Sequence, residues 1–161
     1  MAKIIIIRNT YGGTEYLLNA LEYVSDARAL YRRGFGVNPY NYKQAYDQML
    51  IVREYFGKTS GNPLVHIVIA FNDEVKDLET AAEYTQKCAS YFSSMYQVLY
   101  CTHMKDTHCG SMHAHLVINS VSYLNGKMIT TGYEEMYFFN EYVSEVTGQK
   151  CTFEFDNKAL Y

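Results

Sequence analysis

The sequence has no tryptophan, only two prolines and four cysteines, and it contains no low-complexity tract. The scarcity of proline, together with 48% hydrophobic residues, excludes a disordered or collagen-like chain. The cysteines lack Cys-x-x-Cys spacing and no secretion signal accompanies them, which argues against a disulfide framework. We therefore expect reduced thiols at Cys88, Cys101, Cys109 and Cys151.

Long hydrophobic runs are also missing. The apolar stretch from Ile4 to Ile7 is bracketed by Lys3 and Arg8, and it is far too short for a signal-peptide core or a membrane span. We expect a cytoplasmic protein without a membrane segment.

Charge of one sign is not in large excess, because the formal net charge is −3. A strongly basic nucleic-acid binder, with a pI above about 9, is thereby excluded. Residues 1–60 nevertheless carry eight Lys or Arg against five Asp or Glu, whereas residues 61–161 carry six against twelve. The mildly basic first third could face an anionic partner, but charge alone does not identify that partner. The 17 tyrosines fit either ordinary amphipathic packing or base stacking, and both interpretations stay open.

A length of 161 residues fits one domain, and we expect residues 1–161 to form it. Apolar periodicity predicts its strands and helices. The strands are expected at residues 3–8, 64–71, 98–103, 112–123 and 152–155, and the helices at 14–26 (with Thr14 as N-cap), 42–56, 78–95 and 133–146.

The order of these elements indicates an α+β fold with a mostly antiparallel central sheet and flanking helices. Residues 64–71 are almost continuously apolar and should form a central strand, while residues 98–103 and 112–123 should form a hairpin. Residues 29–41 have no clean period and are expected to be a surface loop, the best candidate for a mobile element. Four basic residues lie in or beside this segment: Arg28, Arg32, Arg33 and Lys43.

Four of the five histidines fall between residues 103 and 115. His113 and His115 are one residue apart, so a strand projects both side chains from the same face. The hairpin returns His103 toward them. Three converging imidazoles can bind a divalent ion and leave positions open for substrate oxygens. An incidental His-x-His pair is the competing interpretation, and the third histidine with the nearby Asp106 favours the metal site.

A structural zinc site is a second possibility for the same region. Its ligands would be Cys101, His103, His108 and Cys109, which include the soft donors of such sites. No Cys-x-x-Cys knuckle preforms this set, so cysteines that merely fill space are the simpler interpretation.

Several short stretches carry a longer pattern. They are HAHLVINSVSYLNGK at residues 113–127, Cys101-Thr102-His103, HIVIAF at 66–71, FGKTSG at 56–61 and Tyr23-Val24-Ser25-Asp26. The pattern resembles the relaxase and mobilisation nuclease family of the HUH type, whose members nick plasmid or transposon DNA for conjugative transfer. The resemblance covers about residues 15 to 155. The Asn-Pro-x-Lys-Thr that usually follows the family's tyrosine is here Asp26-Ala27-Arg28-Ala29.

The resemblance implies an HUH-endonuclease-like fold and metal-dependent, site- and strand-specific nicking of DNA. Tyr23 would be the nucleophile that forms a 5′-phosphotyrosine intermediate, and Asp106 would assist its deprotonation. His103, His113 and His115 would hold Mg²⁺ or Mn²⁺. The substrate would be single-stranded DNA at a transfer origin, contacted by Arg28, Arg32, Arg33 and Lys43, with accessory mobilisation proteins as possible partners.

Alternatives remain for the residues and for the function. Tyr16 and Tyr11 are the other candidate nucleophiles, and His108 is the reserve metal ligand. A degenerate relative that binds single-stranded DNA without cutting, or an unrelated histidine–metal protein, would fit the same residues.

Overall fold

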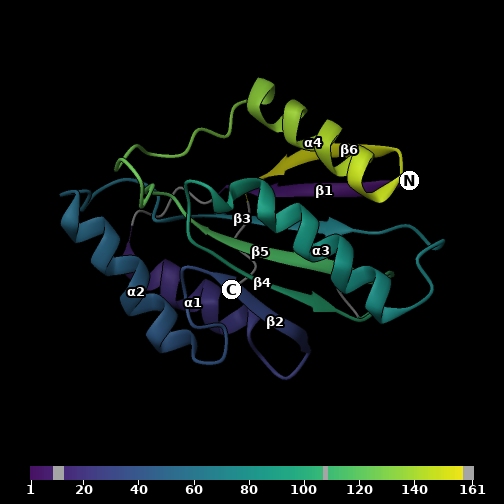
Figure 1. Ribbon diagram of the computed structural model, residues 1–161, viewed down its shortest axis with the longest axis horizontal. Coiled ribbons are helices and arrows are strands. Elements are labelled where there is room, and N and C mark those ends of the chain that lie inside the picture. The colour runs from purple at the N-terminus through teal and green to yellow at the C-terminus, as the bar shows by residue number, and fades with distance from the viewer. Residues whose placement is uncertain (9–12, 107–108, 158–161) are drawn as a thin grey trace.

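The computed structural model describes residues 1–8, 13–106 and 109–157, which form one sheet flanked by helices (Figure 1). The strands are β1 (Ala2–Ile7), β2 (Ala29–Phe35), β3 (Leu64–Ala70), β4 (Val98–His103), β5 (His113–Asn119) and β6 (Cys151–Asp156). The helices are α1 (Thr14–Val24), α2 (Tyr42–Tyr55), α3 (Leu78–Ser93) and α4 (Tyr133–Thr147). All four predicted helices and all five predicted strands are present, with ends shifted by a few residues.

The strand order in the sheet is β2-β4-β5-β3-β1-β6. Every neighbouring pair is antiparallel except β1 and β6, which are parallel. The predicted α+β class with a mostly antiparallel sheet is therefore confirmed. Strands β3 and β5 lie at the centre and are buried along almost their whole length, which explains their continuous apolar sequences.

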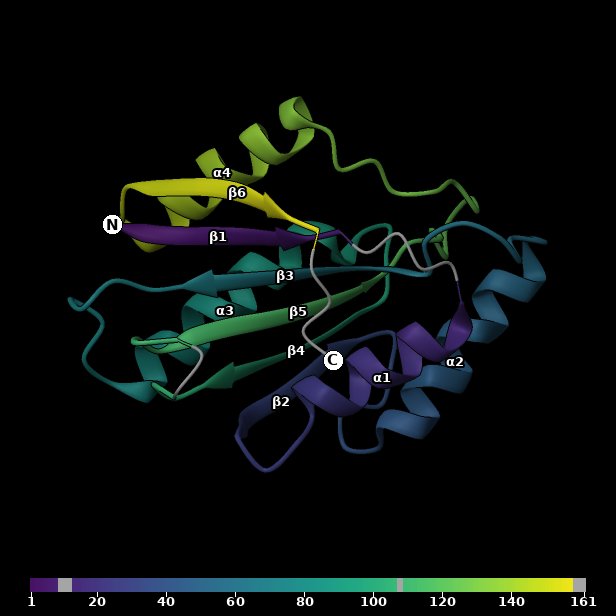
Figure 2. The ribbon, with the colours of Figure 1, turned by 180° about the vertical axis from the view of Figure 1, so that it is seen from behind.

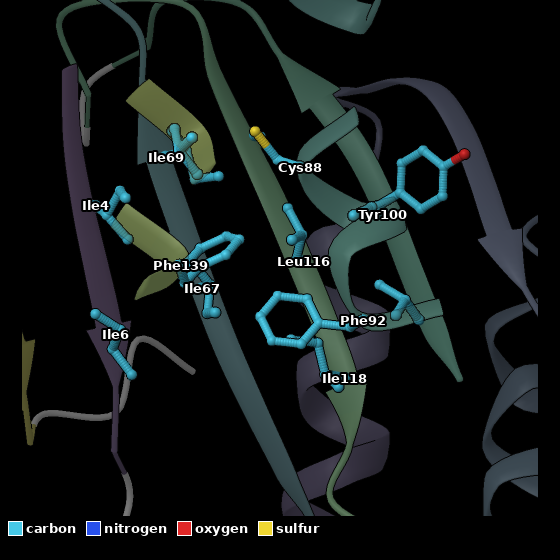
Figure 3. Packing of buried hydrophobic residues seen from close by; sticks show 14 of the residues in the cluster. Ile4, Ile6, Ile67, Ile69, Cys88, Phe92, Tyr100, Leu116, Ile118 and Phe139 are labelled. Carbon is cyan, nitrogen blue, oxygen red and sulfur yellow. The ribbon is translucent and has the colours of Figure 1, made fainter. Parts of the chain in front are cut away.

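Helices α3 and α4 cover one face of the sheet (Figure 1). Phe92 of α3 and Phe139 of α4 meet with ring centroids 4.9 Å apart, above Ile67 and Leu116 of the central strands (Figure 3). Full burial of a phenylalanine side chain stabilises the folded state by about 1.5–3 kcal/mol. The larger of the two clusters of buried residues lies in this layer, which is therefore the main core of the fold.

Helices α1 and α2 pack against each other on the opposite face, over β4 and β5 (Figure 2). Leu17, Leu21 and Val24 recur at helical spacing along α1 and are fully buried there. No helix of the described chain covers β1 and β6 on this face (Figure 2). The C-terminal end of α1 therefore lies beside an open part of the sheet.

The expected surface loop at residues 29–41 is wrong, because its first part is the edge strand β2, paired with β4. The register shifts between Leu30 and Arg33, and Tyr31 has a φ of 49°. This irregularity breaks the alternation of side chains by which a strand is recognised in sequence. The edge strand also passes closely over Val37, whose Cγ2 would lie 2.7 Å from a Cβ at Gly34.

Two smaller expectations need correction. Thr14 is the first residue of α1 rather than its N-cap, which is Gly13. The predicted strand at residues 112–123 ends at Asn119, and Val121 then makes a separate bridge to Met128. None of the helices in the described part of the chain combines the length and apolar character that a membrane-spanning segment needs.

Candidate active site

The pairing of β4 with β5 brings three histidines together. His103 lies directly opposite His113 in the antiparallel register, and His115 follows two residues later on the same face. Their ligand nitrogens lie within 4.8 Å of one another, and all three side chains are buried. The hairpin expected from the sequence thus produces the expected histidine cluster.

Hydrogen bonds orient the rings of two of these histidines. The Nε2 atom of His103 lies 3.2 Å from the carbonyl oxygen of Val24, and Nδ1 of His113 lies 2.9 Å from the carbonyl oxygen of Ser111. A carbonyl only accepts, so the ring nitrogen facing it must carry the proton. The lone pair then resides on Nδ1 of His103 and on Nε2 of His113. Nδ1 of His103 is buried and has no hydrogen-bond partner in the described chain, as expected of a nitrogen that binds a metal ion.

His66 of β3 is a further member of the cluster. From the sequence, this residue was recognised only as part of a strand. Its Nε2 atom lies 2.9 Å from Nδ1 of His115, and its side chain is fully buried. Burial, with a smaller effect of nearby His103, lowers the pKa of His66 to about 3. His66 is therefore neutral at physiological pH and can accept the Nδ1 proton of His115, which leaves Nε2 of His115 to bind a ligand.

The pKa shifts of two of the three other histidines also suit metal binding. Burial lowers the pKa of His103 and, more strongly, that of His115, where the neighbouring histidines add to the effect. Burial opposes protonation of His113 as well, but contacts with Cys109, Ser111 and Asp106 prevail and raise its pKa. Because metal ligation needs neutral imidazole, the shifts of His103 and His115 favour a divalent ion, whereas His113 must lose a proton when the ion binds if it is protonated beforehand.

A pocket of about 250 Å³ opens over the cluster on the face left free by α1. Its polar lining brings together Tyr23, Asp106, Cys109, His113, His115 and Asp156. A pocket of about 340 Å³ lies between α3 and α4 on the opposite face, but no histidine lines it. Chemistry that uses the histidines therefore belongs to the smaller pocket.

Tyr23 lies in the last turn of α1, and its ring centroid is 6.1 Å from that of His115. The guanidinium carbon of Arg28 lies 5.0 Å from the centroid of the Tyr23 ring. Tyr16, the alternative nucleophile on the same helix, is buried in the core between α1 and the sheet. Tyr11, the other alternative, lies outside the described residues.

Arg28 joins two carboxylates beside this tyrosine. Its guanidinium is 2.8 Å from Asp26 and 3.4 Å from Asp106, two residues far apart in the sequence. The contact with Asp26, followed by that with Tyr23, raises the pKa of Arg28. Asp106 in turn lies 3.7 Å from Nε2 of His113. The expected acidic residue is thus held between the cation and a histidine of the cluster.

The other expected DNA contacts lie away from the histidines. Arg32 and Arg33 belong to the edge strand β2, and Lys43 is an exposed residue in the first turn of α2. The pocket over the histidines is lined by none of these three residues.

The proposed zinc ligands are not assembled in the described chain. The thiol of Cys101 is fully buried, donates to the carbonyl oxygen of Val24 at 3.1 Å, and has its pKa raised by burial. It is therefore a protonated core residue. Cys109 contacts His113 but is not grouped with the three histidines, and His108 lies outside the described residues.

The sequence of this domain matches a known protein family. Residues 16–150 match the model of the relaxase family described as MobA/VirD2-like, nuclease domain. The chain belongs to this family. The relaxase resemblance inferred from the sequence motifs is therefore confirmed.

A solved structure described as "Molecular Basis of Vancomycin Resistance Transfer in Staphylococcus aureus" shares the fold of this relaxase domain. The TM-score is 0.63 at 11% sequence identity, and the match covers 94% of this chain and 97% of that chain. No curated protein matches the sequence.

Membership in the family supports, at a coarse level, a nuclease that nicks DNA during mobilisation. Relaxase nuclease domains depend on a metal ion and act on single-stranded DNA, and a histidine triad able to hold an ion is present.

Proposed function

We propose that this relaxase domain nicks one strand of a transfer origin by transesterification, with Tyr23 as nucleophile. The single observation that carries the proposal is that Tyr23 lines the same pocket as His113, His115 and Asp106. Residues 1–161 would act as one nuclease domain on single-stranded or locally melted DNA.

The proposed metal site uses His103, His113 and His115, whose lone pairs converge. Bound Mg²⁺ or Mn²⁺ would neutralise the nonbridging oxygens of the scissile phosphate, which otherwise repel an incoming nucleophile. Hard oxygen ligands of the substrate suit these ions. The carbonyl oxygens of Val24 and Ser111 orient the rings of His103 and His113 with one nitrogen of each ring directed away from the carbonyl, so little reorganisation is needed on binding.

The chemical step forms a bond between the Tyr23 oxygen and phosphorus and breaks the bond from phosphorus to the 3′ oxygen. The phenol proton must leave before or during attack, and the 3′ oxygen must gain a proton as it departs. Asp106 is the proposed proton acceptor, because its carboxylate lies in the pocket between Arg28 and His113. The product is a 5′-phosphotyrosine and a free 3′-hydroxyl.

For Arg28 we propose a role at this centre that differs from the expected DNA contact. Two carboxylates already contact it, and its guanidinium lies over the Tyr23 ring. We therefore assign it to positioning Tyr23 and Asp106, while Arg32, Arg33 and Lys43 remain the proposed DNA contacts. Accessory mobilisation proteins and a cytoplasmic location stay predictions.

Incubation with single-stranded oligonucleotides from the transfer origin of its own element, with and without Mn²⁺, tests the proposal. We expect a shortened strand and a covalent protein–DNA adduct only with Mn²⁺, and neither with His113→Ala. Binding without cleavage would favour the degenerate relative, and neither binding nor cleavage would favour an unrelated metal protein.

A further inference from the structure

The outer edge of β2 carries a pocket that the chemistry of the histidine site does not use. It has a volume of about 340 Å³ and is lined by Ala29, Leu30, Tyr31, Arg32, Arg33 and Tyr40. We call these residues the β2 edge patch. Because β2 is the last strand of the sheet on this side, no strand of the described chain covers the patch.

The patch combines exposed aromatic rings with cations. Tyr31 is 42% and Tyr40 69% exposed, and Nη1 of Arg33 lies 3.3 Å from the hydroxyl of Tyr40. Neither Arg32 nor Arg33 has a carboxylate within ion-pair distance among the residues described. Their charges are therefore available to an anionic ligand.

The backbone presents Tyr31 in an unusual way. With a φ of 49°, Tyr31 is the one residue other than glycine in the described chain that has a left-handed backbone. It lies where the register between β2 and β4 shifts. Non-glycine residues in this conformation are uncommon and cluster at ligand-binding positions. Here the shift places a tyrosine ring beside two arginines at the sheet edge.

The patch begins next to the proposed active site. Ala29 is paired with His103, a proposed metal ligand, and Arg28 contacts Asp106 in the pocket. Tyr31 and Arg33 follow Ala29 by two and four residues, or roughly 7 to 13 Å along a strand. A chain of phosphates that leaves the pocket along β2 would therefore reach the patch within a few nucleotides.

We propose that the β2 edge patch binds the single-stranded DNA that flanks the nick, with bases stacked on Tyr31 and Tyr40 and phosphates held by Arg32 and Arg33. This inference rests on the proposed function. Arginine and aromatic side chains in alternation are the usual means of holding single strands without sequence preference. Helix α4 also has exposed tyrosines, such as Tyr133 and Tyr137. The carboxylates of Glu134 and Glu135 lie in the same helix and would repel phosphates there.

Fluorescence anisotropy with a labelled 12-nucleotide oligo-dT, in buffer containing Mg²⁺, tests the stacking. The variants are Tyr31→Leu and Tyr40→Leu. Their matched controls are Tyr137→Leu and Tyr133→Leu, since the native side chains are 44% and 70% exposed. We expect each patch variant to weaken binding roughly 5- to 100-fold, and each control to match wild type.

Two further measurements separate bases from phosphates. With a 12-nucleotide abasic strand, wild type and Tyr31→Leu should bind equally, because no base is left to stack. The Arg32→Gln/Arg33→Gln double variant should make the log–log salt slope about 1.4 less negative, since each phosphate contact contributes about 0.7 on single strands.

The outcomes distinguish this inference from the proposed function. If wild type binds and nicks single strands while patch and control variants behave alike, the patch is not a nucleotide site and the inference is overturned. If wild type neither binds oligo-dT nor nicks transfer-origin strands, the proposed function itself fails. Weakened binding confined to the patch variants supports the inference, and nicking of transfer-origin strands by wild type supports the proposed function.

Discussion

The Nε2 atom of His66 lies 2.9 Å from Nδ1 of His115, and both rings are buried. Histidines that bind metals usually donate their second ring proton to a carboxylate, a carbonyl or water. Here a neutral imidazole on the neighbouring strand occupies that position. The tautomer of His115, and with it the direction of its lone pair, depends on this partner.

Replacement of His66 tests this dependence. We expect His66→Leu to weaken Mn²⁺ binding about 10- to 100-fold, the usual effect of losing an outer partner, because Nδ1 of His115 then has no acceptor there. His66→Gln restores an acceptor oxygen and should recover part of the affinity. Calorimetric titration with Mn²⁺ measures both. Equal affinity of His66→Leu and wild type, with both folded by circular dichroism, would contradict the role.

The metal-free protein should lose stability in acid. The pKa of His66 is about 3 in the folded chain and near 6.5 when exposed, so below pH 6.5 the unfolded chain takes up the proton more readily. This group alone should lower the free energy of unfolding by about 2 kcal/mol between pH 7.5 and pH 5, and the loss should continue until about pH 3. Urea unfolding in EDTA measures it. His66→Leu should show a smaller loss over the same range, and an identical loss would count against a neutral His66.

Salt dependence reports how many cations contact DNA. Arg28 is already paired with Asp26 and Asp106, which leaves Arg32, Arg33 and Lys43 of the predicted set. Three phosphate contacts give a log–log slope of about −2 for a single strand. Anisotropy titrations at several salt concentrations provide the slope. A value steeper than about −4 would show that the binding face is larger than the basic first third.

Gly34 tests the edge strand that the sequence did not predict. A Cβ there would lie 2.7 Å from Cγ2 and 2.9 Å from the backbone oxygen of Val37. We expect Gly34→Ala to destabilise the fold by about 1–3 kcal/mol, as overpacking does. The control is Gly110→Ala, whose Cβ would meet no atom within 4 Å and which should change stability by less than about 0.5 kcal/mol. Equal unfolding midpoints in urea would argue against the observed packing of β2.

The sequence predicted those parts of the fold in which a regular period is uninterrupted. The helices have such periods, and the central strands β3 and β5 are unbroken apolar runs. A hairpin of β4 and β5 follows from their order, so the approach of His103 to His113 was predictable. Strand β2 was not, because its register shift and the left-handed Tyr31 interrupt the alternation.

Contacts between distant segments were also beyond the sequence. His66 is paired with Val117 across the sheet and reaches His115 diagonally, a contact set by the register of β3 with β5. The contact of Arg28 with Asp106 spans 78 residues, and neither residue type signals the other. The clustering of histidines in the sequence indicated a metal site, but only the register of the strands shows that His66 supports His115.

Peptide mapping of the covalent adduct is the most direct test of the central claim that Tyr23 is the nucleophile. Wild-type protein is incubated with a transfer-origin strand and Mn²⁺, digested, and analysed by mass spectrometry for a tyrosine that carries a nucleotide. The account predicts that the modified residue is Tyr23, and that Tyr23→Phe forms no adduct while it keeps its fold, Mn²⁺ binding and DNA binding. A nucleotide on Tyr16, Tyr11 or any other tyrosine, or an undiminished adduct with Tyr23→Phe, would contradict it.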